Sequence, residues 1–166
     1  MVILDALNEG NLIIVTTSKE KYNLTMQNLY TEFLNYGKKI GYITINRPYS
    51  NVHLKGDVYF VDAITATVQQ PPKLNNCIFV SSPTALTELS IAFSSLFGEK
   101  GCSLVIFDTI STLIIYQDIG TVIKFTHNLV TKASVLNKKA IFIALKEDSE
   151  TLIKDLNMFV DKVIDL

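Results

Sequence analysis

The stretch CSLVIFDTISTLIIY, residues 102–116, predicts the fold more directly than any other part of the chain. Its apolar run from Ser103 to Phe107 is continuous rather than alternating, which is typical of a strand covered on both faces of a parallel sheet. The run places Asp108 at the carboxyl end of that strand. Binding sites of open α/β sheets form at those strand ends, so Asp108 is the first candidate functional residue.

Further apolar runs alternate along the chain with segments of helical periodicity, which predicts an α/β fold. Strands are expected at residues 12–15, 40–45, 58–61, 77–80, 103–107, 140–145 and 159–166. Four helices are expected. The first follows Thr17–Glu20, whose spacing fits a capping box, and ends at Gly37, and the second follows Ser82-Pro83. The other two are expected from Asp118 to Leu136 and over residues 149–156. The sequence therefore predicts a three-layer, mostly parallel, doubly wound sheet of about six to seven strands. Residues 1–166 contain no convincing linker, so one domain is expected.

Composition excludes several classes of protein. With 166 residues, 48% of them hydrophobic, the chain is suited to a folded core. The net charge of −1, with acids and bases interspersed, makes nucleic acid an unlikely partner. No apolar run reaches the roughly 20 residues that a membrane helix needs. The first ten residues do not resemble a signal peptide, so a cytoplasmic protein is expected.

The metal-binding residue types are too sparse to predict a metal site. His53 and His127 have no cysteine or carboxylate at ligand spacing. Cys77 and Cys102 each open an apolar run, which is typical of small buried thiols in a reducing compartment. We therefore expect no bound metal and no disulfide.

Several polar residues fall at predicted strand ends, and each has two interpretations. The candidates are Thr16, Thr17, Ser18, Lys19, Lys21, Arg47, Asp62, Asp108 and Lys146. Asp108 either binds a metal or, as we favour, caps the segment that follows it. An anion-binding helix N-terminus and a capping box explain the hydroxyls of Thr16, Thr17 and Ser18 equally well. Arg47 is compatible with an anion site or with a solvated loop. Among the carboxylates at strand ends, the predicted strand order allows only those of Asp62 and Asp108 to lie close to each other.

Three segments together resemble the RecA-like ATPase fold, and its KaiC branch in particular. Residues 4–7, LDAL, are similar to the element that precedes the phosphate loop there. Residues 104–111, LVIFDTIS, resemble the Walker B strand, and residues 159–164, FVDKVI, resemble a late strand of the family. Residues 45–48 also look like a degenerate archaeal and bacterial relative. The resemblance implies a RecA-like P-loop NTPase topology, with Asp108 at the position of the magnesium-holding acid.

The chain departs from this family where ATP would be bound and hydrolysed. A phosphate loop needs glycines, a lysine and a hydroxyl, yet no glycine occurs between Gly10 and Gly37. If the motif begins at Val15, Lys21 takes the place of the lysine, Glu20 replaces a glycine, and Tyr22 replaces the metal-binding hydroxyl. A shift of the motif by one residue puts Tyr22 at the position of the lysine instead. The catalytic glutamate that the family places after its second strand is also missing from residues 46–49.

Two functions follow from this resemblance and its departures. The first is a non-catalytic RecA/KaiC-like domain, that is, a pseudo-ATPase without a cofactor. Such a domain would serve protein interaction or regulation, either with a protein partner or as a homo-oligomer. The alternative is an ATP-binding protein with a non-standard phosphate loop, in which Lys19 or Lys21 and Asp108 hold ATP with Mg²⁺. A third, weaker option is an enzyme acting on another substrate at the same strand ends. The last strand, 159–166, is expected at an unpaired sheet edge, which favours pairing with another chain.

Overall fold

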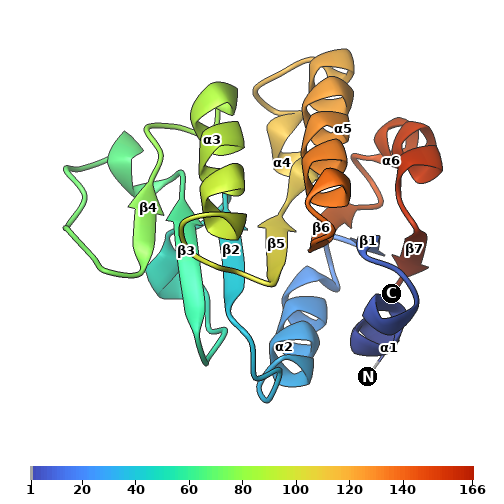
Figure 1. Ribbon diagram of the computed structural model, residues 1–166. Helices are drawn as coiled ribbons and strands as arrows, with labels where there is room; N and C mark the ends of the chain where they lie inside the picture. Colours follow the sequence, from blue (N-terminus) through green and yellow to red (C-terminus); the bar gives the residue numbers. More distant parts are fainter. Residues whose placement is uncertain (1) are drawn as a thin grey trace.

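Seven strands, all parallel, form one sheet in the order β4-β3-β2-β5-β6-β1-β7 in the computed structural model, which describes residues 2–166. Helices cover both faces of this sheet (Figure 1). The three-layer α/β fold with a parallel, doubly wound sheet is therefore confirmed, and the number of strands lies at the upper end of the predicted range.

Every predicted strand is present. The strands are β1 (Leu12–Thr17), β2 (Ile40–Thr44), β3 (Val58–Asp62), β4 (Cys77–Phe79), β5 (Leu104–Asp108), β6 (Lys139–Leu145) and β7 (Lys162–Asp165). The α-helices are α1 (Val2–Glu9), α2 (Tyr22–Glu32), α3 (Leu86–Phe97), α4 (Ile110–Leu113), α5 (Ile119–Val135) and α6 (Glu150–Leu156). Three short 3₁₀ turns complete the structure: η1 (Tyr49–Asn51), η2 (Thr65–Thr67) and η3 (Asn157–Phe159).

Two predicted helix boundaries are wrong. Ser82 and Pro83 do not open α3, because the hydroxyl of Ser82 accepts from the amide of Thr84 in a separate turn before the helix begins at Leu86. Helix α2 ends at Glu32, and Gly37 lies beyond it with a φ of 74°. In both places a local turn forms where the sequence signal suggested the end of a helix.

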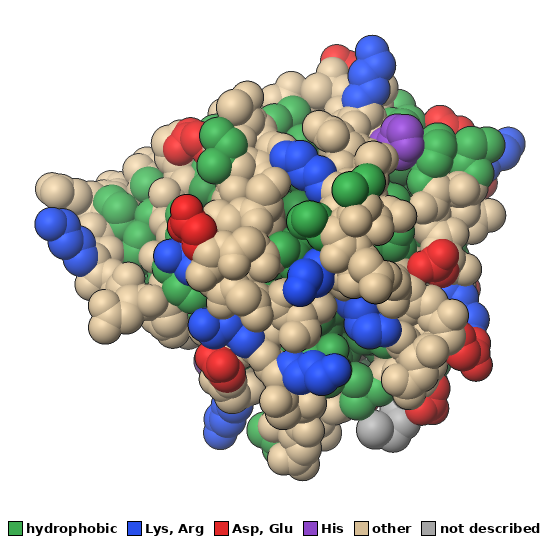
Figure 2. Space-filling model, viewed as in Figure 1, with side chains coloured by type: hydrophobic (Ala, Val, Ile, Leu, Met, Phe, Trp, Pro, Cys, Tyr) green, Lys and Arg blue, Asp and Glu red, His purple; other side chains and the backbone are tan. Residues whose placement is uncertain are grey.

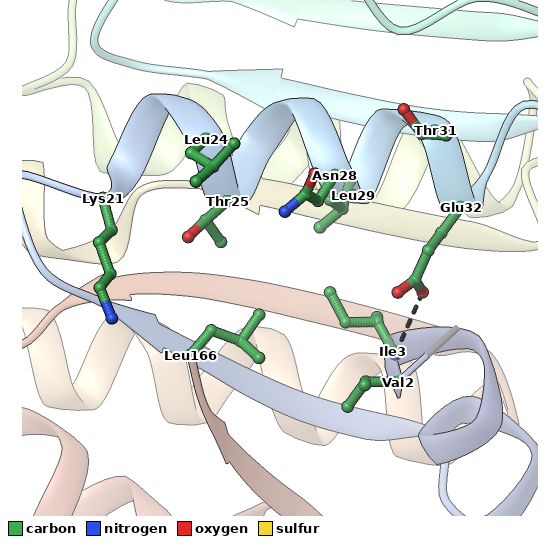
Figure 3. Close-up of a pocket in the computed structure, with 10 residues that line it drawn as sticks. All are labelled: Val2, Ile3, Lys21, Leu24, Thr25, Asn28, Leu29, Thr31, Glu32 and Leu166. Carbon is green, nitrogen blue, oxygen red and sulfur yellow. Dashed lines mark hydrogen bonds between the residues drawn. The ribbon is translucent and has the colours of Figure 1, made fainter.

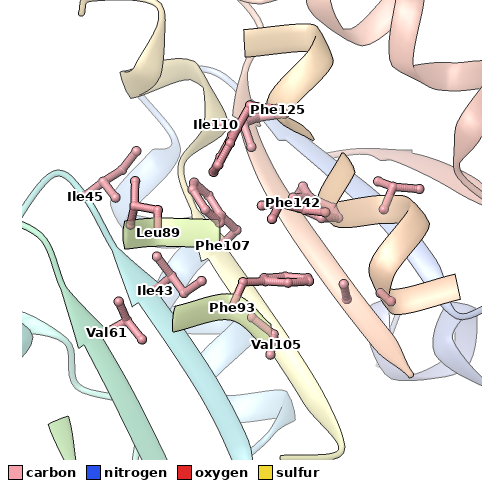
Figure 4. Close-up of a cluster of buried hydrophobic side chains, with 14 of the residues drawn as sticks. Ile43, Ile45, Val61, Leu89, Phe93, Val105, Phe107, Ile110, Phe125 and Phe142 are labelled. Carbon is pink, nitrogen blue, oxygen red and sulfur yellow. The ribbon is translucent and has the colours of Figure 1, made fainter. Parts of the chain in front are cut away.

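The continuous apolar runs of the strands are explained by a core on each side of the sheet. One cluster packs α3, α5 and the shorter α4 and α6 against one face, where Phe93, Phe107 and Phe142 meet in its centre (Figure 4). The other cluster packs α1 and α2 against the opposite face, around Ile13, Leu29 and Ile106. Five of the seven strands, β1, β2, β3, β5 and β6, are buried almost throughout.

The register of the central strands fixes where their carboxyl ends lie. Thr44, the last residue of β2, lies opposite Asp62 of β3 on one side and opposite Asp108 of β5 on the other. All three side chains therefore lie on one face of the sheet, the face that α2 covers. None of the helices within residues 2–166 has the length and apolar character that crossing a membrane would require.

Gly41 of β2 tests the packing of this central strand. A Cβ atom at position 41 would lie 2.8 Å from Cδ1 of Leu96 and 3.1 Å from Cγ2 of Val105, both in the buried core. We expect Gly41→Ala to lower the free energy of unfolding by about 1–3 kcal/mol, because a well-packed core resists an added methyl group. Urea unfolding measures the change. Gly98→Ala is the matched control, since its Cβ would make only an ordinary contact of 3.4 Å with the carbonyl of Ser94; equal losses in the two variants would contradict the packing argument.

Candidate functional site

Asp108 lies at the carboxyl end of β5, as predicted, and its side chain is completely buried. The hydroxyl of Tyr22, at the start of α2, lies 2.7 Å from both carboxylate oxygens of Asp108 and donates to them. The hydroxyl of Tyr42, from the neighbouring strand β2, donates to Oδ2 of the same carboxylate. Two phenols from two different elements therefore hold this acid from the face that α2 covers.

Further polar groups extend this arrangement into a connected network. Tyr30 of α2 lies with its hydroxyl 2.7 Å from that of Tyr42, and Nη2 of Arg47 donates to Tyr30 at 2.9 Å. The same Nη2 lies 3.7 Å from Oδ2 of Asp108, and Arg47 also stacks over the ring of Tyr22. We call Asp108, Tyr22, Tyr30, Tyr42, Asn46 and Arg47 the tyrosine cluster, in which Asn46 contributes a bond of 3.1 Å to the hydroxyl of Tyr22. Arg47 thus points into the cluster, and of its two interpretations the solvated loop is wrong.

The electrostatics of the cluster keep every phenol protonated. Burial, followed by the charge of Asp108, raises the pKa of Tyr22 and of Tyr42 well above the usual range, so both hydroxyls remain donors. Burial raises the pKa of Asp108, while the bonds from Tyr22 and Tyr42 and the charge of Arg47 act in the opposite direction. The carboxylate therefore depends on these three groups to be tolerated inside the protein.

The favoured interpretation of Asp108 as a helix cap is wrong. Helix α4 is capped by Thr109, whose hydroxyl accepts from the amide of Thr112 at 3.0 Å. Ser111, within the segment that Asp108 was expected to cap, contacts Ser149 and accepts from the amide of Leu145 instead. The side chain of Asp108 points away from α4 because β5 turns it toward the face that carries α2.

Carboxylates of the chain itself bind to the loop between β1 and α2. The amide of Lys19 donates to both oxygens of Glu147, at 3.1 and 3.0 Å, and its ammonium lies 3.1 Å from Asp148. The hydroxyl of Ser18 accepts from the amide of Lys21 at 3.2 Å in the turn that precedes α2. The predicted capping box is wrong, because the hydroxyl of Thr17 bonds to Thr25 instead and Lys21, the N-cap of α2, makes no side-chain capping bond. Glu20 is exposed, and within residues 2–166 it forms no hydrogen bond back to this turn.

The remaining candidates at this end of β1 and β6 are also paired. Thr16 donates to Asp165 of β7 at 2.8 Å, and Lys146 lies 2.6 Å from the same oxygen. The hydroxyl of Thr17 lies 2.8 Å from that of Thr25 in the interior. The predicted anion-binding hydroxyls of Thr16 and Thr17 are thus engaged inside the protein.

Asp62 and Asp108 do not form a catalytic pair. Asp62 accepts from the amides of Tyr49, Ile64 and Thr65, at 3.0, 2.7 and 2.9 Å, and so shapes the loops that follow β2 and β3. Strand β2 lies between the two acids, which separates their backbones by roughly 10 Å, two strand spacings. The two carboxylates have no donor in common among the described residues.

An apolar groove lies beside this region, between α1 and α2 (Figure 3). Its volume is about 600 Å³. Val2, Leu24 and Leu166 line it, Lys21 lies at one end, and Glu32 at the other accepts from the amide of Ile3. Lys21, a candidate phosphate ligand, therefore borders the groove rather than the tyrosine cluster.

Within residues 2–166, no group of three or more histidines, cysteines or carboxylates is arranged to hold a metal ion. Both cysteines are buried free thiols, and burial raises the pKa of Cys77 to about 12 and that of Cys102 to about 11. They therefore remain protonated and weakly reactive at neutral pH.

Comparison with known proteins identifies the fold but no family. No family model matches the chain, and no curated protein matches its sequence. Among solved structures, the fold is similar to that of a KaiC-like protein from the hyperthermophilic archaeon Pyrococcus horikoshii OT3, with a TM-score of 0.67. The likeness covers 95% of this chain and 73% of that chain at 12% sequence identity. The chain therefore has a KaiC-like fold of the RecA type, as its sequence predicted, and identity this low shows the fold alone.

Tyr22 provides the first test of the tyrosine cluster. Tyr22→Phe removes the donor shared by both oxygens of Asp108, so we expect unfolding free energy to fall by about 1.5–3 kcal/mol, as for hydrogen bonds to charged groups. Urea unfolding measures the loss. Tyr116→Phe is the control, because the side chain of Tyr116 is half exposed and its hydroxyl bonds to nothing in residues 2–166, so its loss should stay within about 0.5 kcal/mol. A Tyr22→Phe variant as stable as the control would show that the bond contributes nothing.

The raised pKa of Asp108 predicts a pH dependence of stability. A carboxyl whose pKa is higher in the folded state stabilises most when protonated, and this contribution disappears as pH rises through the folded pKa. We therefore expect the wild type to gain stability relative to Asp108→Asn as pH falls from about 7 toward about 4, the pKa of an aspartate in the unfolded chain. The difference between the two proteins in free energy of unfolding, measured with urea, isolates the contribution of Asp108, because all other groups titrate in both proteins. A wild type that instead loses stability relative to the variant would mean that the donors outweigh burial.

Proposed function

We propose that residues 1–166 form a single RecA/KaiC-like domain that works without catalysis, as a cytoplasmic pseudo-ATPase serving protein interaction or regulation. One observation carries the proposal: the acid at the Walker B position, Asp108, is buried and held by Tyr22, Tyr42 and Arg47. This acid has the contacts of a structural residue.

The geometry around Asp108 opposes a magnesium ion. Mg²⁺ requires oxygen ligands at about 2.0–2.1 Å in near-octahedral geometry. The hydroxyl of Tyr22 faces both oxygens of Asp108 and presents a proton to them, and burial keeps that proton in place. If the motif begins at Val15, Tyr22 takes the position at which the resemblance calls for a metal-binding hydroxyl. An ion that bound these oxygens would displace this phenol and break both of its bonds to Asp108.

The loop after β1 also opposes a triphosphate. Glu147 accepts from the amide of Lys19, and Asp148 pairs with the ammonium of the same residue. These carboxylates occupy the groups that would otherwise attract phosphate oxygens. Exposed acids add to the effect, because Glu20 and Glu147 would place negative charge beside an incoming polyanion.

Thermal unfolding with and without millimolar ATP and Mg²⁺ tests the proposal. A ligand that binds only the folded state must raise the melting temperature, so we expect no shift beyond that given by Mg²⁺ alone. An upward shift with ATP that disappears in Asp108→Ala would overturn the proposal. It would favour the alternative, an ATP-binding protein with a non-standard phosphate loop, and Lys19→Ala and Lys21→Ala would then identify its phosphate ligands.

A further inference from the structure

Strand β7 lies at one edge of the sheet and, within residues 2–166, pairs with β1 alone. The amide of Leu166 donates inward to the carbonyl of Thr16 at 2.9 Å. Because successive backbone amides of a strand alternate in direction, those of Val163 and Asp165 point outward from the sheet. Among residues 2–166 these outward donors and acceptors have no partner, and they are the groups through which a further strand binds.

Charged side chains normally protect such an edge, but those of β7 are paired within the chain. Lys162 forms an ion pair with Glu9 of α1. Asp165 accepts from Thr16 and lies 2.6 Å from the ammonium of Lys146. Both charges are therefore paired with groups of their own chain and partly neutralised, which weakens their ability to repel an approaching strand.

Apolar side chains are exposed on both sides of this edge. In η3, which directly precedes β7, Met158 is 79% exposed, and Phe159 stacks on His127 while remaining 37% exposed. Figure 2 shows hydrophobic side chains gathered beside a histidine at this end of the molecule. On the other face, Val2, 57% exposed, and Leu166 line the groove between α1 and α2. An exposed apolar border on each face of an unpaired strand is typical of an interface.

We infer that a second copy of this chain pairs with β7 in antiparallel orientation, about a two-fold axis perpendicular to the sheet. A two-fold axis makes the interface self-complementary, since each copy supplies the same edge and the same apolar borders. It also continues the core on both faces, because each face of one sheet joins the corresponding face of the other. The inference rests on the proposed interaction role and names its partner.

The charges of the strand select one register. Residues opposed across such an axis lie on the same face, so the central pair is either Val163 with Val163 or Ile164 with Ile164. Centring on Val163 would oppose Asp165 of one copy to Asp161 of the other, and like charges directly opposed destabilise a sheet. Centring on Ile164 opposes Asp165 to Val163 and Lys162 to Leu166, with no like charges opposed. The outward amides of Val163 and Asp165 then meet as a hydrogen-bonded pair.

The apolar borders must contribute to the interface, because four residues of strand pairing bury too little area for a stable dimer. A specific dimer buries about 1,200–2,000 Å² in total. Met158 and Phe159 on one face, with Val2 and Leu166 on the other, are the side chains placed to supply the remainder. A single charge placed at the border should therefore weaken the dimer without affecting the fold.

Sedimentation equilibrium of the 166-residue chain over a range of concentrations tests the dimer. We expect twice the mass of the chain for the wild type and a dissociation constant raised at least tenfold in Met158→Lys. Val135→Lys is the matched control, because Val135 is also 79% exposed but lies at the end of α5, and its dimer should equal that of the wild type. A monomeric wild type at every concentration, or equal weakening in both variants, would overturn the inference.

Oxidative cross-linking tests the register and does not depend on the Met158 variant. In the register centred on Ile164, the two copies of residue 164 in Ile164→Cys form a non-hydrogen-bonded pair, whose Cα atoms lie about 4.5 Å apart, within the roughly 4.4–6.8 Å range of a disulfide, whereas Val163→Cys does not oppose itself. We expect an intermolecular disulfide in the first variant only, and Cys77 and Cys102 will not interfere because both are buried. Cross-linking of Val163→Cys alone, or of neither variant, would contradict the proposed pairing.

The two proposals fail separately. A monomeric chain whose melting temperature ignores ATP would remove the dimer and leave the pseudo-ATPase proposal intact. A dimer that is stabilised by ATP and Mg²⁺ would contradict the pseudo-ATPase proposal and leave the dimer intact. The two results are separable because β1 and β6 lie between β7 and β5, the strand that carries Asp108.

Discussion

A carboxylate inside an apolar sheet is the constraint on which the centre of this structure depends. An unpaired charge in such a place costs several kcal/mol, so Asp108 must have donors or be protonated. The chain provides phenols from Tyr22 of α2 and Tyr42 of β2, and a guanidinium from Arg47 in the loop after β2. Satisfying one acid therefore fixes how α2 lies over the sheet, and it holds the loop after β2 against the end of β5.

The same constraint limits what the site can do. A catalytic or metal-binding carboxylate keeps an oxygen available to its ligand, as open metal sites do. The oxygens of Asp108 instead face hydroxyls whose protons are retained, because burial and the acid itself raise the pKa of Tyr22 and Tyr42. Aromatic side chains also fill the volume on that face, since Tyr30 and Tyr42 pack edge to face with their ring centroids 6.0 Å apart. Asp108 thus lies at the end of a central strand, while its surroundings are those of a packed core.

Sequence reasoning located the strands and their ends but missed how those ends are connected. Runs such as Leu12–Val15 and Ser103–Phe107 are unambiguous because a strand buried on both faces has no polar alternation, and the position of Asp108 follows from them. The partners of Asp108 could not be found in this way, because Tyr22 lies 86 residues earlier in the chain and fits the apolar stripe of its helix equally well. One signal was present: Tyr42 lies within the run 40–45, and a buried phenol needs a partner. The supposed pair of Asp62 and Asp108 failed because β2 lies between their strands.

Function in a fold of this kind is best sought where polar groups of the chain remain unsatisfied. At the strand ends, the carboxylates of Asp62 and Asp108 and the amide of Lys19 all bind to groups of the same chain. The tips therefore offer a ligand few groups that are not already engaged. At the edge of β7 the outward backbone amides have no partner among the described residues, and the apolar side chains beside them face solvent. In a domain whose strand ends are internally satisfied, association through the backbone of its edge strand is the interaction that these outward groups favour.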